Sequence, residues 1–209
     1  MTVVEAIAAF TVAAGILTLT PGLDTALILR TAAVEGPKRA VLAVAGIQAG
    51  CFCWGALAAF GIGAVLQASV LAFTILKWAG AAYLVWMGIN LILKPRDSFE
   101  VSTQGQASSG SDTTWMLRGF LSNMLNPKMG VFYVSFLPQF LPHDVPAAPF
   151  MLGLTGIHMV LGVLWLGTLI AATQPIARVL KRAAVVRWLD RVTGGVFVAF
   201  GLRLALDRR

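Results

Sequence analysis

Residues 119–140 read GFLSNMLNPKMGVFYVSFLPQF, an apolar stretch that is interrupted near its middle by Asn126, Pro127 and Lys128. About 20 apolar residues suffice for a helix that crosses a membrane, so the stretch is long enough to do so. Pro127 should break that helix, because proline removes a backbone hydrogen bond and clashes with the preceding turn. A lysine in such a position is costly unless it forms a pair or reaches water. The stretch therefore predicts a broken transmembrane helix whose break faces protein or a cavity.

A second break of the same kind is expected near the N-terminus, where residues 18–24 read TLTPGLD. Pro21 and Gly22 interrupt the helix there, and the carboxylate of Asp24 follows two residues later. Counted from residue 5 along a straight helix, Asp24 lies about 28 Å into the membrane, in its cytoplasmic half. Two simpler interpretations stay open, in which Asp24 caps a helix near that surface and Lys128 extends its ammonium to it.

The composition of the chain is typical of a membrane protein. Of its 209 residues, 58% are hydrophobic and 12% are charged, and the mean hydropathy is +0.81. A soluble domain carries about 25% charged residues, so this chain could not cover a water-facing surface in the usual way. The net charge of +7 does not indicate nucleic acid, because the basic residues stand in short clusters between apolar runs, as they do where they control membrane topology.

Apolar runs bounded by charges or turn signals predict six transmembrane helices. They span approximately residues 5–30, 40–66, 70–93, 115–141, 147–174 and 190–206. The last run is short for a span and should begin earlier, around Val185. The predicted fold class is an all-α integral membrane protein, with one transporter domain over residues 1–209.

The only long polar stretch, residues 94–114, divides the spans into two groups of three, in residues 1–93 and 115–209. It contains QGQASSGSDTT, a composition typical of a flexible linker. Each half holds an odd number of spans, so the two halves should insert with opposite orientation. This arrangement is typical of a transporter built from two inverted three-helix repeats.

Markers in the two halves support such a repeat. Pro21 and Pro127 are 106 residues apart, and Gly88 and Gly201 are 113 residues apart within similar small-residue patterns. The two offsets are nearly equal, which favours a repeat. The alternative is that small residues recur by chance in apolar helices.

The basic residues predict the orientation. They gather in the first, third and fifth loops, as Arg30, Lys38, Arg39, Lys94, Arg96, Arg118, Arg178, Lys181, Arg182, Arg187 and Arg191. The loops around residues 67–69 and 142–146 contain no lysine or arginine. Positive loops face the cytoplasm, so the linker at 94–114 should be cytoplasmic and both termini should lie outside. Arg203, Arg208 and Arg209 near the C-terminus disagree with this orientation.

Polar residues inside the spans are the candidates for a binding site, because each is costly in lipid. Asp24 and Lys128 provide opposite charges beside paired breaks, which suits a zwitterion or a proton-linked ion pair. Asn126 and Gln48 are further candidates for substrate binding, although Gln48 could equally join two helices. Asp24 and His158 are candidates to carry a coupled proton. For His158, a hydrogen bond to a neighbouring helix is the simpler interpretation.

Several of these stretches together resemble the LysE/RhtB family of amino-acid exporters. The resemblance is carried by TPGLD (20–24), GIQAG (46–50), LKWAGAAYLVWMG (76–88), the block at 119–140 and RVTGGVFVAFGLRLAL (191–206). It covers all six predicted spans in order, and it implies efflux of lysine, threonine, homoserine or a related amino acid, driven by proton exchange. The first motif of the family usually reads PGP, whereas this chain has Leu23 in place of the second proline.

The predicted function is therefore secondary export of a small amino acid, threonine/homoserine-like or lysine-like, across a bacterial inner membrane by proton antiport. The alternative is an exporter of a different small cationic or metal substrate. Metal traffic would favour clustered Asp, Glu, His or Cys, but Cys51 and Cys53 point to opposite sides of a helix. An enzyme is not expected, because neither GxSxG nor HExxH occurs. No cofactor or nucleic acid is expected; the predicted partners are the amino acid, protons and the lipid bilayer, and a homo-oligomer stays open.

Overall fold

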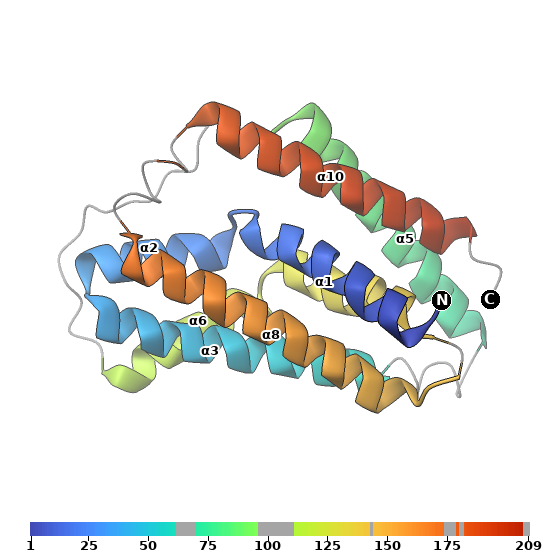
Figure 1. Ribbon diagram of the computed structural model, residues 1–209, viewed down its shortest axis with the longest axis horizontal. Helices are drawn as coiled ribbons and strands as arrows, with labels where there is room; N and C mark the ends of the chain where they lie inside the picture. The colour runs from blue at the N-terminus through green and yellow to red at the C-terminus, as the bar shows by residue number, and fades with distance from the viewer. Residues whose placement is uncertain (62–69, 96–110, 143, 174–178, 180–181, 207–209) are drawn as a thin grey trace.

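The computed structural model describes residues 1–61, 70–95, 111–142, 144–173, 179 and 182–206, and every regular element in these ranges is helical. The α-helices are α1 (Val3–Leu19), α2 (Leu23–Val34), α3 (Pro37–Ala56), α5 (Val70–Leu93), α6 (Asp112–Met124), α7 (Pro127–Val131), α8 (Ala147–Ala171) and α10 (Ala183–Leu206). The π-helical turns η1 (Leu57–Gly61) and η2 (Phe132–Phe136) and the 3-10 turn η3 (Leu137–Phe140) complete the described elements. Figure 1 shows their arrangement.

The first predicted span is two helices rather than one. Helix α1 ends at Leu19, α2 begins at Leu23, and the two are bent by 52°. Pro21 lies in the break because it cannot continue the hydrogen bonding of α1. Gly22 follows in an extended conformation as the N-cap residue of α2, with no side chain to cap the new helix. The break expected at Pro21 and Gly22 is therefore present, since the backbone at residues 20–22 is not helical.

The fourth predicted span, residues 115–141, is also divided, into α6, α7, η2 and η3. Pro127 begins α7, where its missing N–H is not needed. Asn126 caps α7 by accepting a hydrogen bond from the Lys128 N–H at 3.1 Å. Pro138 lies near the start of the 3-10 turn η3. The chain in this region therefore changes helix type repeatedly instead of forming one straight span.

The other predicted boundaries differ from the structure only at their ends. Helix α5 has the predicted bounds of 70–93, α3 begins three residues earlier than expected, and α8 ends three residues earlier. For the second span, residues 62–66 lie outside the described residues. Helix α10 begins at Ala183, ahead of both 190 and Val185. Its first turns contain the buried Val186, so the helix packs well before its apolar run begins.

Helix α3 packs against α6 and α8, α1 lies beside α8, and α5 pairs with α10 along one side of this group (Figure 1). Glycines make the closest of these approaches possible. Backbone atoms of Met116 in α6 occupy the space where a Cβ of Gly46 would stand, and Ala43 does the same to Gly119. Gly88 and Gly194 face each other in the same way between α5 and α10. Small residues let transmembrane helices approach to backbone contact, which explains the glycines of these spans.

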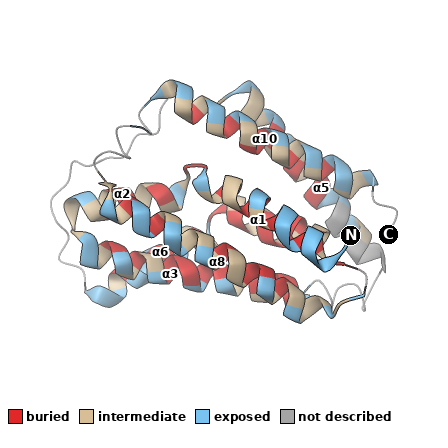
Figure 2. Cartoon of the chain, viewed as in Figure 1, coloured by how far each residue is buried: buried red, intermediate tan, exposed pale blue. Residues whose placement is uncertain are grey.

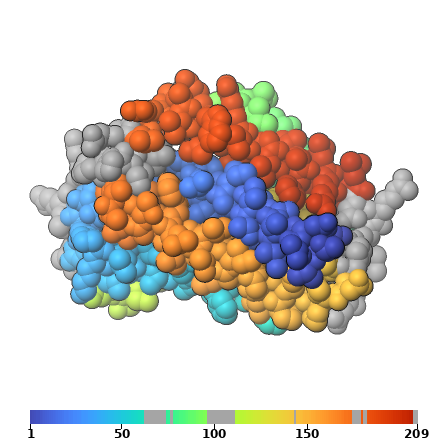
Figure 3. All heavy atoms as spheres, in the orientation of Figure 1, coloured from blue at the N-terminus to red at the C-terminus, as the bar shows by residue number. Residues whose placement is uncertain are grey.

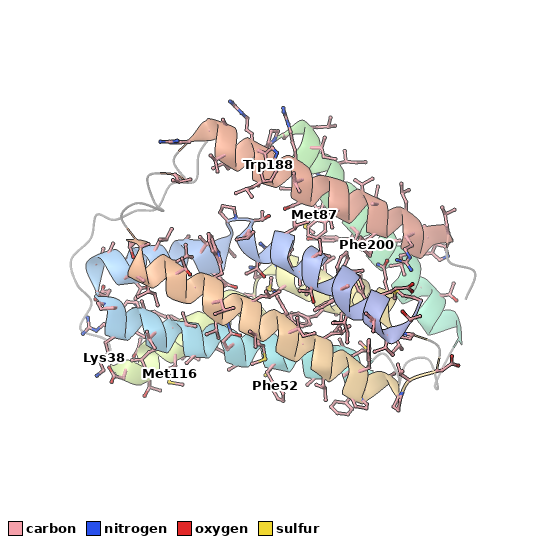
Figure 4. The ribbon with its side chains drawn as sticks, viewed as in Figure 1. Lys38, Phe52, Met87, Met116, Trp188 and Phe200 are labelled. Atoms are coloured by element: carbon pink, nitrogen blue, oxygen red, sulfur yellow. The ribbon has the colours of Figure 1, made fainter. Side chains whose placement is uncertain are left out.

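Aromatic rings join the α5–α10 pair to the rest of the molecule. Phe200 of α10, labelled in Figure 4, has its ring centroid 4.2 Å from that of Phe136 and 5.2 Å from that of Phe140. Thr20, at the break after α1, contacts Thr193 of α10 through their hydroxyl groups. The α5–α10 pair therefore packs directly against both interrupted spans.

Many large apolar side chains are exposed on the described helices, while several polar side chains are buried among the apolar residues of the interior. In α8, the polar residues Thr155 and His158 are buried, whereas Val160 and Leu164 are 60% and 64% exposed. Exposed and intermediate residues run along the outer faces of the helices (Figure 2), and Figure 3 shows α1 and α8 side by side on one of these faces. An apolar outer surface around polar interior residues is what contact with lipid requires.

Among the described helices, Pro37–Gly61 and Ala147–Ala171 are each long and apolar enough to cross a membrane. The α1–α2 pair adds a third span if the bent pair is counted as one. Helix α10 has the length of a span but carries Arg187, Asp190 and Arg191 in its first half. The structure therefore agrees with an all-helical integral membrane protein, and the six-span inverted repeat stays a prediction.

Candidate functional site

A cavity lies where the two interrupted spans meet. The space in it that the centre of a water molecule can reach is about 50 Å³, enough for a few water molecules. The five residues predicted from the sequence to bind substrate or protons all line it, namely Asp24, Gln48, Asn126, Lys128 and His158. They come from α2, α3, the α6–α7 break, α7 and α8. The structure therefore brings the predicted residues together, although it does not test their roles.

The Asp24 carboxylate, in the first turn of α2, is held from α6. Its Oδ1 accepts a hydrogen bond from the Ser122 hydroxyl at 2.7 Å, and its Oδ2 accepts one from the Asn123 amide at 2.9 Å. The expectation of a helix cap near the cytoplasmic surface does not describe these contacts, because Gly22 is the N-cap residue and both bonds reach another helix. Asp24 is thus a carboxylate fixed at the cavity between two spans.

The Lys128 ammonium, in the first turn of α7, reaches back to the end of α1. Its Nζ donates hydrogen bonds to the carbonyl oxygens of Leu17 at 3.2 Å and Thr20 at 3.1 Å. These carbonyls lie at the C-terminal end of a helix, which carries a partial negative charge. The Lys128 ammonium therefore bonds to protein at the first helix break.

The two neutral candidates have structural contacts as well as a place in the cavity wall. Asn126 caps α7, so part of its function is to start that helix. The side chain of Gln48 lies against Gly162 of α8, where its amide nitrogen is 2.9 Å from the position a Cβ would occupy. Both expectations for Gln48, a contact between helices and a place at the binding site, therefore agree with its position.

His158 is buried in α8 and forms a hydrogen bond between its Nδ1 and the Tyr133 hydroxyl of η2, at 2.7 Å. Its ring centroid is also 4.9 Å from that of Phe132. The simpler expectation, a hydrogen bond between helices, agrees with this contact. His158 nevertheless lines the same cavity as Asp24 and Lys128, so the contact does not separate it from the site.

Sequence reasoning missed several residues of this region. Ser122 is a partner of Asp24 but lies 98 residues away in the chain. Cys51, which the sequence analysis did not place at the site, accepts a hydrogen bond from the Asn123 amide at 3.4 Å and also lines the cavity. The one available signal was the Ser-Asn pair just before the second break, because polar neighbours in a span are themselves costly.

The described residues contain no group of three or more His, Cys, Asp or Glu side chains that could hold a metal ion. Cys51 and Cys53, both in α3, are free thiols. Among the described residues that line the cavity, the carboxylate of Asp24 and the ammonium of Lys128 are the only groups with a formal charge. Such an arrangement can bind a small polar molecule through opposite charges and hydrogen bonds.

Long apolar helices, an exposed apolar surface and two interrupted helices that meet at a polar cavity are features of a multi-pass membrane protein. The comparison with known families agrees: the LysE type translocator matches residues 15–208, and the chain belongs to this family.

Relatives of similar length carry names of efflux proteins. The chain is 32% identical to a homoserine/homoserine lactone efflux protein of Salmonella typhimurium, over 96% of both chains. It is 31% identical to a leucine efflux protein of Klebsiella pneumoniae, over 94% of this chain and 92% of the relative. A threonine efflux protein of Salmonella typhimurium is 29% identical over 91% and 92%. No solved structure matches the chain significantly.

Gly50→Ala should impair transport without preventing insertion into the membrane. A Cβ at this position would lie 2.8 Å from Oδ1 and 2.9 Å from Cβ of Asn123, so the amide that bonds to Asp24 must move. Hydrogen bonds to charged groups are worth about 1.5–3 kcal/mol, which predicts a loss of about tenfold or more in transport. Transport normalised to the amount of membrane protein measures this. Gly153→Ala in α8, where a Cβ meets no atom within 4 Å, is the matched control and should leave transport unchanged.

Proposed function

We propose that this protein exports a small amino acid with an uncharged side chain across the bacterial inner membrane, in exchange for protons. The observation that carries the proposal is the position of Asp24 and Lys128 at one cavity, each beside a helix break. Relatives named for efflux of homoserine, threonine and leucine support the substrate class.

The two ends of the cavity suit the two charges of a zwitterion. Asp24 would bind the ammonium group of the amino acid. Lys128 and the start of α2 would favour its carboxylate, because α2 begins at Gly22 in the cavity wall without a side-chain cap. The N-terminal end of a helix carries a partial positive charge, and interrupted helices in other transporters bind substrate carboxylates in this way.

The charges of the cavity wall favour an amino-acid substrate with a neutral side chain over one with a basic side chain. The cavity wall has Asp24 as its single acid and Lys128 as its single base, besides His158. A lysine substrate would bring a second ammonium that finds no second carboxylate in this wall. A metal cation is also disfavoured, because the described residues offer no cluster of ligands for it.

Proton exchange would operate through Asp24. With the carboxylate charged, the cavity binds the amino-acid ammonium on the cytoplasmic side. On the outer side a proton taken up by Asp24 would replace the ammonium and release the amino acid. Return of the protonated carboxylate to the cytoplasmic side would then carry one proton inward for each amino acid released.

Reciprocal contacts between the breaks support the proposed inverted repeat. Asp24, after the first break, bonds to Asn123 before the second, and Lys128, after the second, bonds to Leu17 before the first. Leu17 and Asn123 are 106 residues apart, the same offset as the two prolines, and Asp24 and Lys128 are 104 residues apart. A two-fold relation between the halves would bring the two breaks together in approximately this way.

The proposed orientation has both termini outside, with the linker at 94–114 in the cytoplasm. Single cysteines at positions 36 and 108, in a background without Cys51 and Cys53, should be labelled only from the cytoplasmic side, and one at position 144 only from outside. Position 108 lies outside the described residues. Labelling of position 108 from the outside of intact cells would overturn the proposed orientation.

Counterflow in proteoliposomes tests the proposed substrate class. Vesicles loaded with unlabelled threonine should accumulate labelled threonine, homoserine or leucine, and should accumulate lysine at least about tenfold less, because an unpaired charge in a membrane site costs ~2.5 kcal/mol or more. Equal exchange of lysine would contradict the assignment to neutral amino acids. Exchange of none of the four would contradict amino-acid export.

A further inference from the structure

Two sets of buried polar contacts lie beside the cavity, one around Asp24 and one around His158. The amide of Asn123 donates to Asp24 at 2.9 Å and to the sulfur of Cys51 at 3.4 Å. The Tyr133 hydroxyl forms a hydrogen bond with Nδ1 of His158 at 2.7 Å. Cys51, Asn123, Tyr133 and His158 are each at most 5% exposed. Neither Cys51 nor Tyr133 is required by the transport cycle proposed above.

The hydrogen of the Tyr133–His158 bond could lie on either partner. A phenol hydroxyl is a better donor than the N–H of a neutral imidazole, and an imidazole nitrogen is a better acceptor than a phenol oxygen. The favoured arrangement therefore keeps this hydrogen on the Tyr133 oxygen and leaves Nδ1 of His158 as the acceptor.

An imidazole that accepts at Nδ1 carries its hydrogen at Nε2. Among the described residues, His158 has no hydrogen-bond partner other than Tyr133, and it lies in the cavity wall. With Nδ1 as the acceptor, a neutral His158 keeps an Nε2–H, and this hydrogen is available to a ligand in the cavity.

We propose that Tyr133 is a positioning residue that holds His158 as the Nε2–H tautomer, and that this N–H binds a carboxylate oxygen of the transported amino acid. The proposal rests on the proposed function for the identity of the ligand. It assigns His158 to substrate recognition and leaves the coupled proton to Asp24.

The position of the other charges favours a carboxylate as the partner of His158. Asp24 would attract the ammonium group, and it accepts hydrogen bonds from α6. Lys128 donates to the carbonyls of Leu17 and Thr20, so part of its hydrogen-bonding capacity is used by α1. A second donor for the carboxylate would therefore supplement the Lys128 charge.

The composition of the chain makes the tautomer directly measurable. It contains two histidines, His143 and His158, and two tyrosines, Tyr83 and Tyr133. In a His143→Gln background, ¹⁵N-labelled histidine reports on His158 alone. We expect one neutral species with its proton on Nε2, and a shift of the Nε2 resonance on addition of L-threonine. A proton on Nδ1, or a positively charged ring at neutral pH, would overturn the proposal without any use of a variant at Tyr133.

Tyr133→Phe keeps the ring but removes the donor, so the Nδ1 and Nε2 resonances should shift towards a mixture of the two tautomers. In counterflow, the KM for L-threonine should rise about fivefold, as expected for loss of one hydrogen bond worth about 1 kcal/mol, while the maximal rate changes less than about twofold. Tyr83→Phe is the matched control and should change neither quantity. An unchanged tautomer and KM in Tyr133→Phe would contradict the positioning role.

L-Threoninamide lacks the carboxylate of L-threonine. Its inhibition of counterflow therefore tests whether His158 binds that carboxylate, independently of whether the protein transports amino acids. The parent protein should bind L-threonine far better than the amide, and Tyr133→Phe should narrow this difference about fivefold because it weakens the contact to the carboxylate. If Tyr133→Phe transports L-threonine but the difference in binding between L-threonine and the amide is as large as in the parent, the proposed role of His158 would be overturned. The proposed function would then be unaffected. Absence of all amino-acid counterflow in the parent would instead overturn the proposed function.

Discussion

Asp24→Asn should abolish proton-coupled export while the protein still folds and inserts. Asparagine keeps the size of the side chain and can still accept the hydrogen bond from Ser122, so the contact with α6 is partly retained. The charge that would bind the ammonium group and the group that would carry the proton are both lost. Removal of one partner of a buried charged pair costs ~2–5 kcal/mol, which predicts a loss of about thirtyfold or more in export.

The measurement is efflux of labelled threonine from cells or proteoliposomes, normalised to the amount of protein in the membrane. Asp144→Asn makes the same chemical change in an exposed loop residue and should leave efflux unchanged. Efflux near the parent level in Asp24→Asn would mean that the carboxylate has only a structural role, as a contact between α2 and α6.

Lys128→Met should reduce both export and stability. Methionine has a similar length but no donor, so the carbonyls of Leu17 and Thr20 would lose the Nζ hydrogen bonds at the end of α1. Leaving buried polar groups without partners costs about 1–3 kcal/mol, and more in a membrane, where water cannot replace the donor. We therefore expect a lower unfolding temperature in detergent and a loss of about tenfold or more in export.

Lys38→Met is the matched control, because the Lys38 side chain is 81% exposed and pairs with Asp112 at the surface. It should change neither quantity. Lys128→Arg tests geometry, since a planar guanidinium replaces a compact ammonium; we expect poor rescue of export. Normal export and stability in Lys128→Met would show that the ammonium contributes neither to the break nor to the site.

The sequence predicted the main elements of the site because the relevant signals are local. Proline inside an apolar run marks a break, and a charge beside it must avoid lipid; from these two rules Asp24 and Lys128 were expected near one another. The bounds of α5 were also predicted, because charged and polar residues flank its apolar run. The hydrogen bonds of these charges were not predictable, because their partners lie about a hundred residues away along the chain.

Two details of the structure go beyond what the sequence encodes. Helix α10 begins at Ala183, close to the early start expected around Val185, and its first turns are fixed by the burial of Val186 and Asp190, which hydropathy does not report. The hydrogen bond that Cys51 accepts from Asn123 depends on the position of α6 beside α3, which no local pattern encodes.

The central proposal, that a neutral amino acid leaves in exchange for a proton, is tested most directly with equal threonine on both sides of a proteoliposome membrane. An imposed pH gradient is then the only driving force. Protons move from the acidic to the alkaline side, so antiport predicts that threonine accumulates on the acidic side and that threonine speeds the decay of the gradient. Accumulation on the alkaline side, or no net movement of threonine, would contradict proton antiport.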